Sequence, residues 1–119
     1  MNTQKIYGTQ ERVHKGLFSE TASKTKIAGY SKKIGEESFR AFLEMLFLLP
    51  NPKLIKSPLL VIGAANDRIV SQNSILKTAQ SYQADVKIFP DMAHDLMLEE
   101  GWETVAEFIC SWLRKRLMR

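Results

Sequence analysis

The sequence predicts an α/β fold: a parallel strand-helix-strand-helix unit preceded by helical segments. A continuous apolar run at Leu59–Ile62 is typical of a strand that is buried on both faces, as in parallel sheets. Strand and helix patterns then alternate to the end of the chain, and a helix between two strands implies a right-handed parallel crossover. The 119 residues are enough for one domain.

The part that precedes the first strand is expected to be helical. Residues 1–35 are polar, lysine-rich and interrupted by glycines, which favours loops and short helices. Leu17 and Phe18 form an isolated apolar pair that we expect to dock on another part of the chain. From Glu36 to Leu49 apolar side chains recur at helical spacing, which predicts one very apolar helix ended by prolines.

From the first strand to the end of the chain, predicted strands and helices alternate. The first strand leads into a small-residue turn at 63–66, and Ser71 or Asn73 can cap a helix that runs to about Tyr82. A second strand at Val86–Phe89 follows, and the last helix begins at Glu99 or Gly101. The apolar stripes expected to be buried are Ile75, Leu76, Ala79 and Tyr82 on the first helix and Trp102, Val105, Ala106, Ile109, Trp112 and Leu113 on the last.

Composition bounds the function classes. Apolar residues make up 45% and charged residues 25% of the chain, as in ordinary globular proteins. The single cysteine, Cys110, forms no internal disulfide, is expected to be a small buried hydrophobe, and is compatible with a cytoplasmic location. No segment resembles a signal peptide or is long enough to span a membrane. The basic cluster at 114–119 has two interpretations, a solvated helix end or a contact with polyanions, and we favour the first.

Two residues stand where chemistry is expected. Asp67 follows the first strand and His94 follows the second, so both lie beyond the carboxyl ends of parallel strands, where ligands bind. If the strands are neighbours, about 4.8 Å apart, the carboxylate can reach the imidazole. Such a pair makes histidine a general base that activates a hydroxyl or thiol nucleophile.

The same residues also have structural interpretations. Asp67 alone is compatible with a simple turn residue, and His94 with an ordinary loop histidine. Asp91 and Asp95 flank His94 but are too close in sequence to orient its ring easily, so Asp67 is preferred. The other histidine, His14, is expected to be solvated. The strand-turn-helix setting of an exposed nucleophile is absent at Ser19, Ser23, Ser31 and Ser38, and also at Cys110.

Two segments resemble the α/β-hydrolase family. Residues 57–70 (SPLLVIGAANDRIV) resemble its strand and acid loop, and residues 89–99 (FPDMAHDLMLE) resemble its histidine loop. The final helix, with Trp102, Ile109 and Trp112, is similar to the closing helix of that fold. Residues 17–49, which include the stretch 38–46 (SFRAFLEML), look like part of the helical cap that these enzymes insert before the same strands.

The resemblance implies a partial α/β-hydrolase fold, with residues 1–52 as a cap-like helical segment and residues 53–119 as the C-terminal part of the core. It implies Asp67 as the triad acid and His94 as the triad base. Ala93 departs mildly from the glycine usual before the histidine. The larger departure is that no Gly-x-Ser-x-Gly elbow occurs in the 119 residues.

Three hypotheses follow. The first is the C-terminal portion of a serine hydrolase, esterase-like or lipase-like, that acts on a small-molecule ester once a nucleophile is supplied. The second is a catalytically inactive, truncated hydrolase-like protein that self-associates, most simply as a dimer. The third, and least favoured, is a basic module that contacts nucleic acid or membrane through residues 114–119. No cofactor or metal site is expected.

Overall fold

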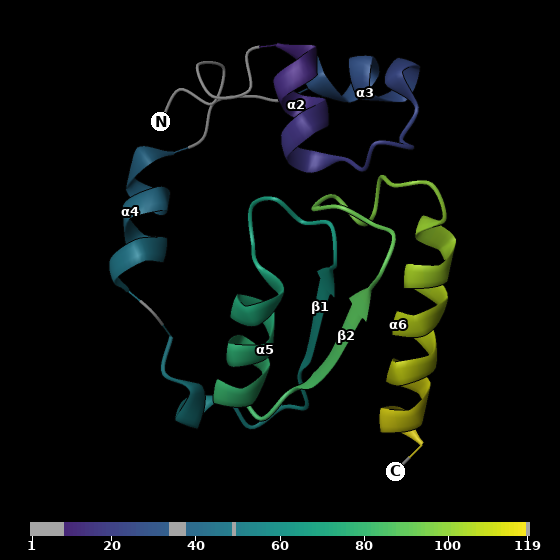
Figure 1. The fold of residues 1–119 in the computed structure, drawn as a ribbon. Coiled ribbons are helices and arrows are strands. Elements are labelled where there is room, and N and C mark those ends of the chain that lie inside the picture. Colours follow the sequence, from purple (N-terminus) through teal and green to yellow (C-terminus); the bar gives the residue numbers. More distant parts are fainter. Residues whose placement is uncertain (1–8, 34–37, 49, 119) are drawn as a thin grey trace.

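The two predicted strands form a parallel pair at the centre of the fold (Figure 1). In the computed structural model, residues 9–33, 38–48 and 50–118 are described. The elements are α2 (Gln10–Leu17), α3 (Lys24–Ser31), α4 (Phe39–Phe47), a 3₁₀ turn (Pro52–Leu54), β1 (Leu60–Ala64), α5 (Gln72–Ser81), β2 (Asp85–Phe89) and α6 (Trp102–Leu117). The parallel register, from Leu60 opposite Asp85 to Ala64 opposite Phe89, confirms the predicted α/β unit.

Helix α5 covers one face of the strand pair. Gly63 of β1 faces Ile75 so closely that a Cβ added at the glycine would lie 2.2 Å from the Cδ1 atom of Ile75. Only glycine lets the helix approach this near. Ile75 and Ala79 are buried as predicted, but Leu76 is 48% exposed. The predicted stripe was therefore too wide, because one helix facing two strands buries only a narrow row.

Helix α6 covers the opposite face. Val105 packs with Ala64 and Phe89, and Phe108 meets the Phe89 ring edge to face. The predicted stripe is wrong at its ends, because Trp102 is 48% exposed and Leu113 is 45% exposed. Cys110, expected to be buried, is also exposed. The row that meets the strands includes Phe108, which the sequence reading placed outside the stripe.

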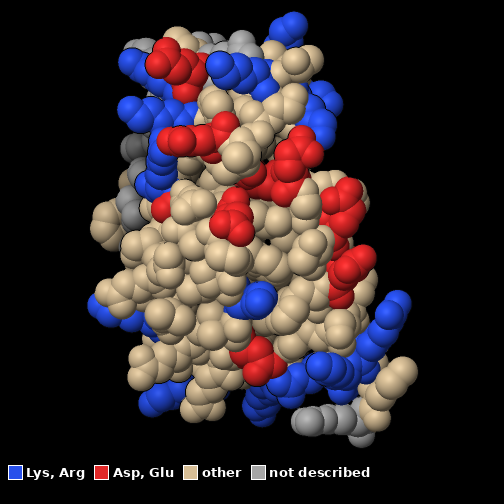
Figure 2. Space-filling view, turned by 45° about the vertical axis from the view of Figure 1, so that its right-hand side comes forward, with Lys and Arg blue, Asp and Glu red and all other residues tan. Residues whose placement is uncertain are grey.

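The C-terminal end of α6 is fastened to the start of β2. The indole Nε1–H of Trp112 donates to the Asp85 carboxylate at 2.6 Å, and Arg116 pairs with the same carboxylate. The guanidinium of Arg116 also lies 5.4 Å from the centre of the Trp112 ring. Figure 2 shows basic side chains gathered at this lower end of the molecule. No described helix is both long and apolar enough to cross a membrane.

Helices α2 and α3 lie beyond the carboxyl ends of both strands (Figure 1). They have a hydrophobic cluster of their own, formed by Val13, Phe18, Ala22 and Ile27. The prediction that Leu17 and Phe18 dock on another part of the chain is confirmed, because Leu98 packs against this cluster. His14, expected to be solvated, is half-buried, and its Nε2–H donates to the Ser19 carbonyl at 3.0 Å.

Helix α4 lies at the side of the molecule, on the same side of the strand pair as α5 and away from the sheet (Figure 1). Ser38 caps it by accepting a hydrogen bond from the amide of Ala41 at 3.3 Å. Its predicted start at Glu36 and end at Leu49 fall outside the described residues, as do the side chains of Phe39, Phe42 and Leu46. Its described apolar side chains Met45 and Phe47 are 65% and 76% exposed, so this part of the chain leaves them uncovered.

Candidate functional site

The loops that carry Asp67 and His94 are joined by backbone hydrogen bonds beyond the strands themselves. The amide of Ala65 donates to the Phe89 carbonyl at 2.8 Å, and the amide of Asn66 donates to the Met92 carbonyl at 3.0 Å. Parallel pairing thus continues into the first residues of both loops. As a result, the two loops rise together from the carboxyl edge of the sheet.

Asp67 divides its carboxylate between its own turn and the histidine. Its Oδ1 atom accepts hydrogen bonds from the amides of Ile69 at 2.7 Å and Val70 at 2.9 Å. Its Oδ2 atom accepts the Nδ1–H of His94 at 2.9 Å. The side chain is only 6% exposed. The predicted juxtaposition of the two side chains is thereby confirmed.

The second ring nitrogen of His94, Nε2, takes no part in the hydrogen bond with Asp67. A hydrogen bond from Nδ1–H to a carboxylate selects the tautomer in which Nε2 carries a lone pair. The side chain is 34% exposed, and among the described residues no hydrogen bond uses Nε2. This arrangement holds the ring still while leaving a base open to a neighbouring group.

The pKa of Asp67 lies below its ordinary value. Burial acts to raise the pKa, but the hydrogen bonds from Val70, His94 and Ile69 together outweigh it. The carboxylate therefore stays ionised beside His94. The pKa of Asp95 moves the other way, chiefly because burial disfavours its charged form, although the nearby His94 acts to lower it.

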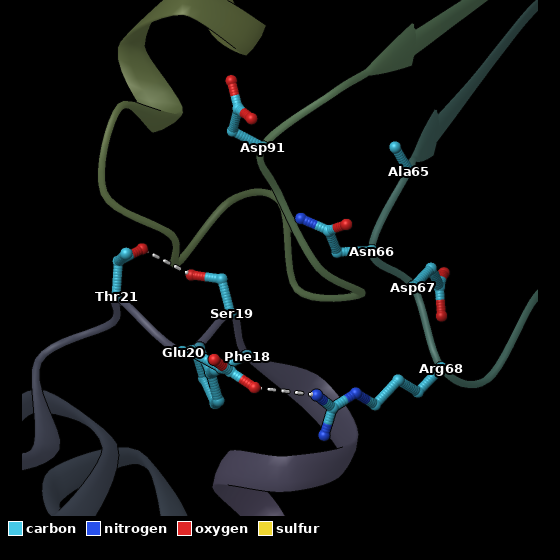
Figure 3. A pocket seen from close by; sticks show the side chains of 9 residues that line it. All are labelled: Phe18, Ser19, Glu20, Thr21, Ala65, Asn66, Asp67, Arg68 and Asp91. Atoms are coloured by element: carbon cyan, nitrogen blue, oxygen red, sulfur yellow. Dashed lines mark hydrogen bonds and ion pairs between the residues drawn. The ribbon is translucent and has the colours of Figure 1, made fainter.

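The flanking acids do not compete for the ring. Asp95 contributes its backbone amide, which donates to the Leu17 carbonyl at 3.0 Å. Asp91 lines a neighbouring cavity (Figure 3). The Nδ1–H of His94 donates to Asp67, the acid that the sequence favoured.

A polar cavity of about 670 Å³ adjoins the acid loop. Figure 3 shows the helical segment on one side of it and the loop after β1 on the other. The Arg68 guanidinium bridges the two sides, donating to the Lys15 carbonyl at 3.1 Å and to Glu20 at 3.4 Å. The lining residues are Phe18, Ser19, Glu20, Thr21, Ala65, Asn66, Asp67, Arg68 and Asp91.

Comparison with known proteins adds nothing to this geometry. No family model, curated protein or solved structure matches the chain.

Ser19, which the sequence did not single out as a site residue, lines the cavity beside Asp67. Its hydroxyl donates to Glu99 at 2.6 Å, and the serine is 7% exposed, so its hydroxyl is already engaged. The only signal of its placement was the apolar pair that precedes it. Within residues 9–33, 38–48 and 50–118, no three ligating side chains gather to hold a metal ion.

Proposed function

We propose that Asp67 and His94 are the acid and base of a hydrolytic site for ester-type bonds, and that the nucleophile comes from a segment other than these 119 residues. The observation that carries the proposal is the 2.9 Å hydrogen bond between the two side chains at the carboxyl edge of a parallel strand pair. Ligands bind at that edge of parallel sheets.

The chemistry follows from the tautomer. Nε2 of His94 takes the proton of an attacking hydroxyl or thiol and later returns it to the leaving group. Asp67 stabilises the imidazolium that forms in between. Acyl transfer also needs donors that bind the oxyanion, and these would accompany the nucleophile.

The arrangement of the elements supports a closing portion of an α/β-hydrolase fold. Helices α5 and α6 lie on opposite faces of the strand pair, and α2 and α3 lie over the edge where a cap would sit (Figure 1). Among the described residues, β1 pairs only with β2, so the other edge of β1 is open to a further strand.

The test is complementation. The chain is mixed with a polypeptide that supplies the preceding strands and a Gly-x-Ser-x-Gly elbow, and hydrolysis of a short-chain nitrophenyl ester is followed. We expect turnover that falls by about 10³-fold or more in His94→Ala, because the general base is lost. Lys77→Ala, at an exposed position of α5, is the control and should leave turnover unchanged. Turnover that survives His94→Ala, or no turnover with any such partner, would reject the proposal.

The second candidate is an inactive hydrolase-like protein that self-associates. The observation in its favour is the exposed apolar surface of α4, represented by Met45 and Phe47. We expect a dimer in analytical ultracentrifugation that Phe47→Lys converts to monomer. Leu117→Lys changes an equally exposed leucine at the far end of α6 and is the control. A monodisperse wild-type monomer would exclude this candidate.

A further inference from the structure

Glu99 is a buried carboxylate whose two oxygens both bind one distant residue. It is 2% exposed, and it lies 80 positions along the chain from Ser19. Its Oε1 accepts the Ser19 amide at 2.5 Å, and its Oε2 accepts the Ser19 hydroxyl at 2.6 Å. Burying a carboxylate is costly unless such hydrogen bonds are made. The pair therefore joins the loop after α2 rigidly to the loop before α6.

The segment from His94 to Glu99 is attached to residues 17–19 at both of its ends. At one end the Asp95 amide donates to the Leu17 carbonyl at 3.0 Å. At the other end the Glu99 carboxylate accepts hydrogen bonds from the Ser19 amide and hydroxyl. Between them Leu98 packs on the cluster of α2 and α3. His94 directly precedes the first of these attachments, so the position of its backbone depends on them.

Glu100 provides a contrast within the same region. It also connects the two parts, through a 2.9 Å ion pair with Lys26, but the two side chains are 54% and 57% exposed. Exposed pairs contribute little to stability because water and salt screen them. Only the buried member of this adjacent pair of acids can fix the geometry.

We propose that Glu99 is a positioning residue for His94, acting through residues 17–19 to keep the imidazole against Asp67. The catalytic meaning of this role rests on the proposed function, whereas the coupling itself is a property of the isolated chain. Without Glu99, the attachments of segment 94–99 to residues 17–19 and to the cluster of α2 and α3 are reduced, among the described residues, to the Leu17 hydrogen bond and the packing of Leu98. The His94 ring then leaves Asp67 more often.

The test is exchange with water, measured by NMR on the full chain. The probes are the Nδ1–H proton of His94, the Ser19 amide, and the Ala65 amide that donates to Phe89 beyond the strands. In Glu99→Ala we expect the first two to exchange at least about tenfold faster, since hydrogen bonds to a charged group are lost. The Ala65 amide should not change.

Three further variants sharpen the result. Glu99→Gln keeps an acceptor for the Ser19 amide and should show a smaller change. Ser19→Ala removes the hydroxyl bond to Glu99, and with it the hydroxyl contact to Thr21, but keeps the amide bond to Glu99. It should shift the His94 proton in the same direction, which keeps the test open if Glu99→Ala folds poorly. Glu100→Ala is the matched control and should stay within about twofold of the wild type, because its ion pair is screened.

Two outcomes would overturn the proposal. In the first, the Ser19 amide exchanges faster while the His94 proton does not, which would make the contact merely structural. In the second, all three protons accelerate together in both Glu99→Ala and Ser19→Ala, which would mean a loss of global stability. Neither outcome depends on turnover, so failure of complementation and failure of this coupling are separate results.

Discussion

His94 donates its Nδ1–H to one carboxylate oxygen of Asp67, while the other oxygen of Asp67 is held by amides of its own turn. The structural and catalytic interpretations of Asp67 therefore describe one arrangement. The turn fixes the carboxylate, and the carboxylate fixes the ring. Such preorganisation is what the proposed acid-base pair needs.

Asp67→Asn should invert the tautomer of His94. If the asparagine oxygen keeps the amides of Ile69 and Val70, its NH₂ group faces Nδ1, which must then accept rather than donate. Nitrogen-15 NMR of the ring should show the proton moving from Nδ1 to Nε2. Asp67→Ala, which loses the turn bonds as well, should cost about 2 kcal/mol in urea unfolding. An unchanged ring tautomer in Asp67→Asn would contradict the assigned hydrogen bond.

The stability of the protein should depend on pH in opposite ways through two acids. The pKa of Asp67 is lowered on folding, so its contribution is present above its ordinary value of 3.8 and is lost as the pH falls through the lower folded value. The pKa of Asp95 is raised, so its ionisation costs stability as the pH rises from 3.8 through the higher folded value.

Two asparagine variants separate these contributions in urea unfolding at several pH values. The stability lost in Asp67→Asn should shrink as the pH falls from 3.8 through the lower folded pKa of Asp67, because first the unfolded and then the folded carboxylate takes up a proton. The stability gained in Asp95→Asn should appear above pH 3.8 and grow as the pH rises through the higher folded pKa of Asp95. Differences that do not vary with pH would contradict both directions.

Gly63→Ala should be destabilising although alanine favours strands more than glycine does. The added Cβ would meet the Ile75 side chain at 2.2 Å, and overpacking of this kind costs about 1–3 kcal/mol. Ile75→Val offers room, so the double variant should lose less than the sum of the two single variants. Additive losses would mean that the two residues do not touch. Gly29→Ala is the control, since nothing lies within 4 Å of its Cβ position.

The two tryptophans should respond differently to replacement by phenylalanine. Trp112 donates to Asp85, so Trp112→Phe should lose about 1 kcal/mol and loosen the end of α6. Trp102 is 48% exposed, and Trp102→Phe should be close to neutral. Thermal unfolding compares the two variants directly. A larger loss of stability in Trp102→Phe than in Trp112→Phe would mean that Trp102 lies on the buried face of α6, as the sequence predicted.

The encounter of Asp67 with His94 was predictable because two strong local signals lie at equivalent ends of two strands. Both apolar strands and their order could be predicted from the sequence, and parallel pairing of the strands then brings the two loops together. Ser19 and Glu99 gave no such signal. Their partnership depends on how α2 and α3 sit over the loops, a long-range docking that no local pattern encodes.

The fold was least predictable where helices are short or packed on small surfaces. The cluster of Val13, Phe18, Ala22 and Ile27 spans two short helices and the turn between them, so no single period runs through it. The buried row of α6 was misplaced because the spacing of apolar residues predicts a helix but does not determine which of its faces packs on the strands. In the structure, Val105 and Phe108 pack on them. Membership of the chain in the α/β-hydrolase family stays a prediction.

The 80-position separation of Ser19 and Glu99 has a consequence for the order of folding. Contacts between distant parts of a chain form late because the loop between them must first be closed. The strand pair and its two helices join residues close in sequence and are expected to assemble first. Helices α2 and α3 complete their cluster only when Leu98 arrives. We therefore expect α2 and α3 to dock over the proposed acid-base pair last and to detach first under denaturant.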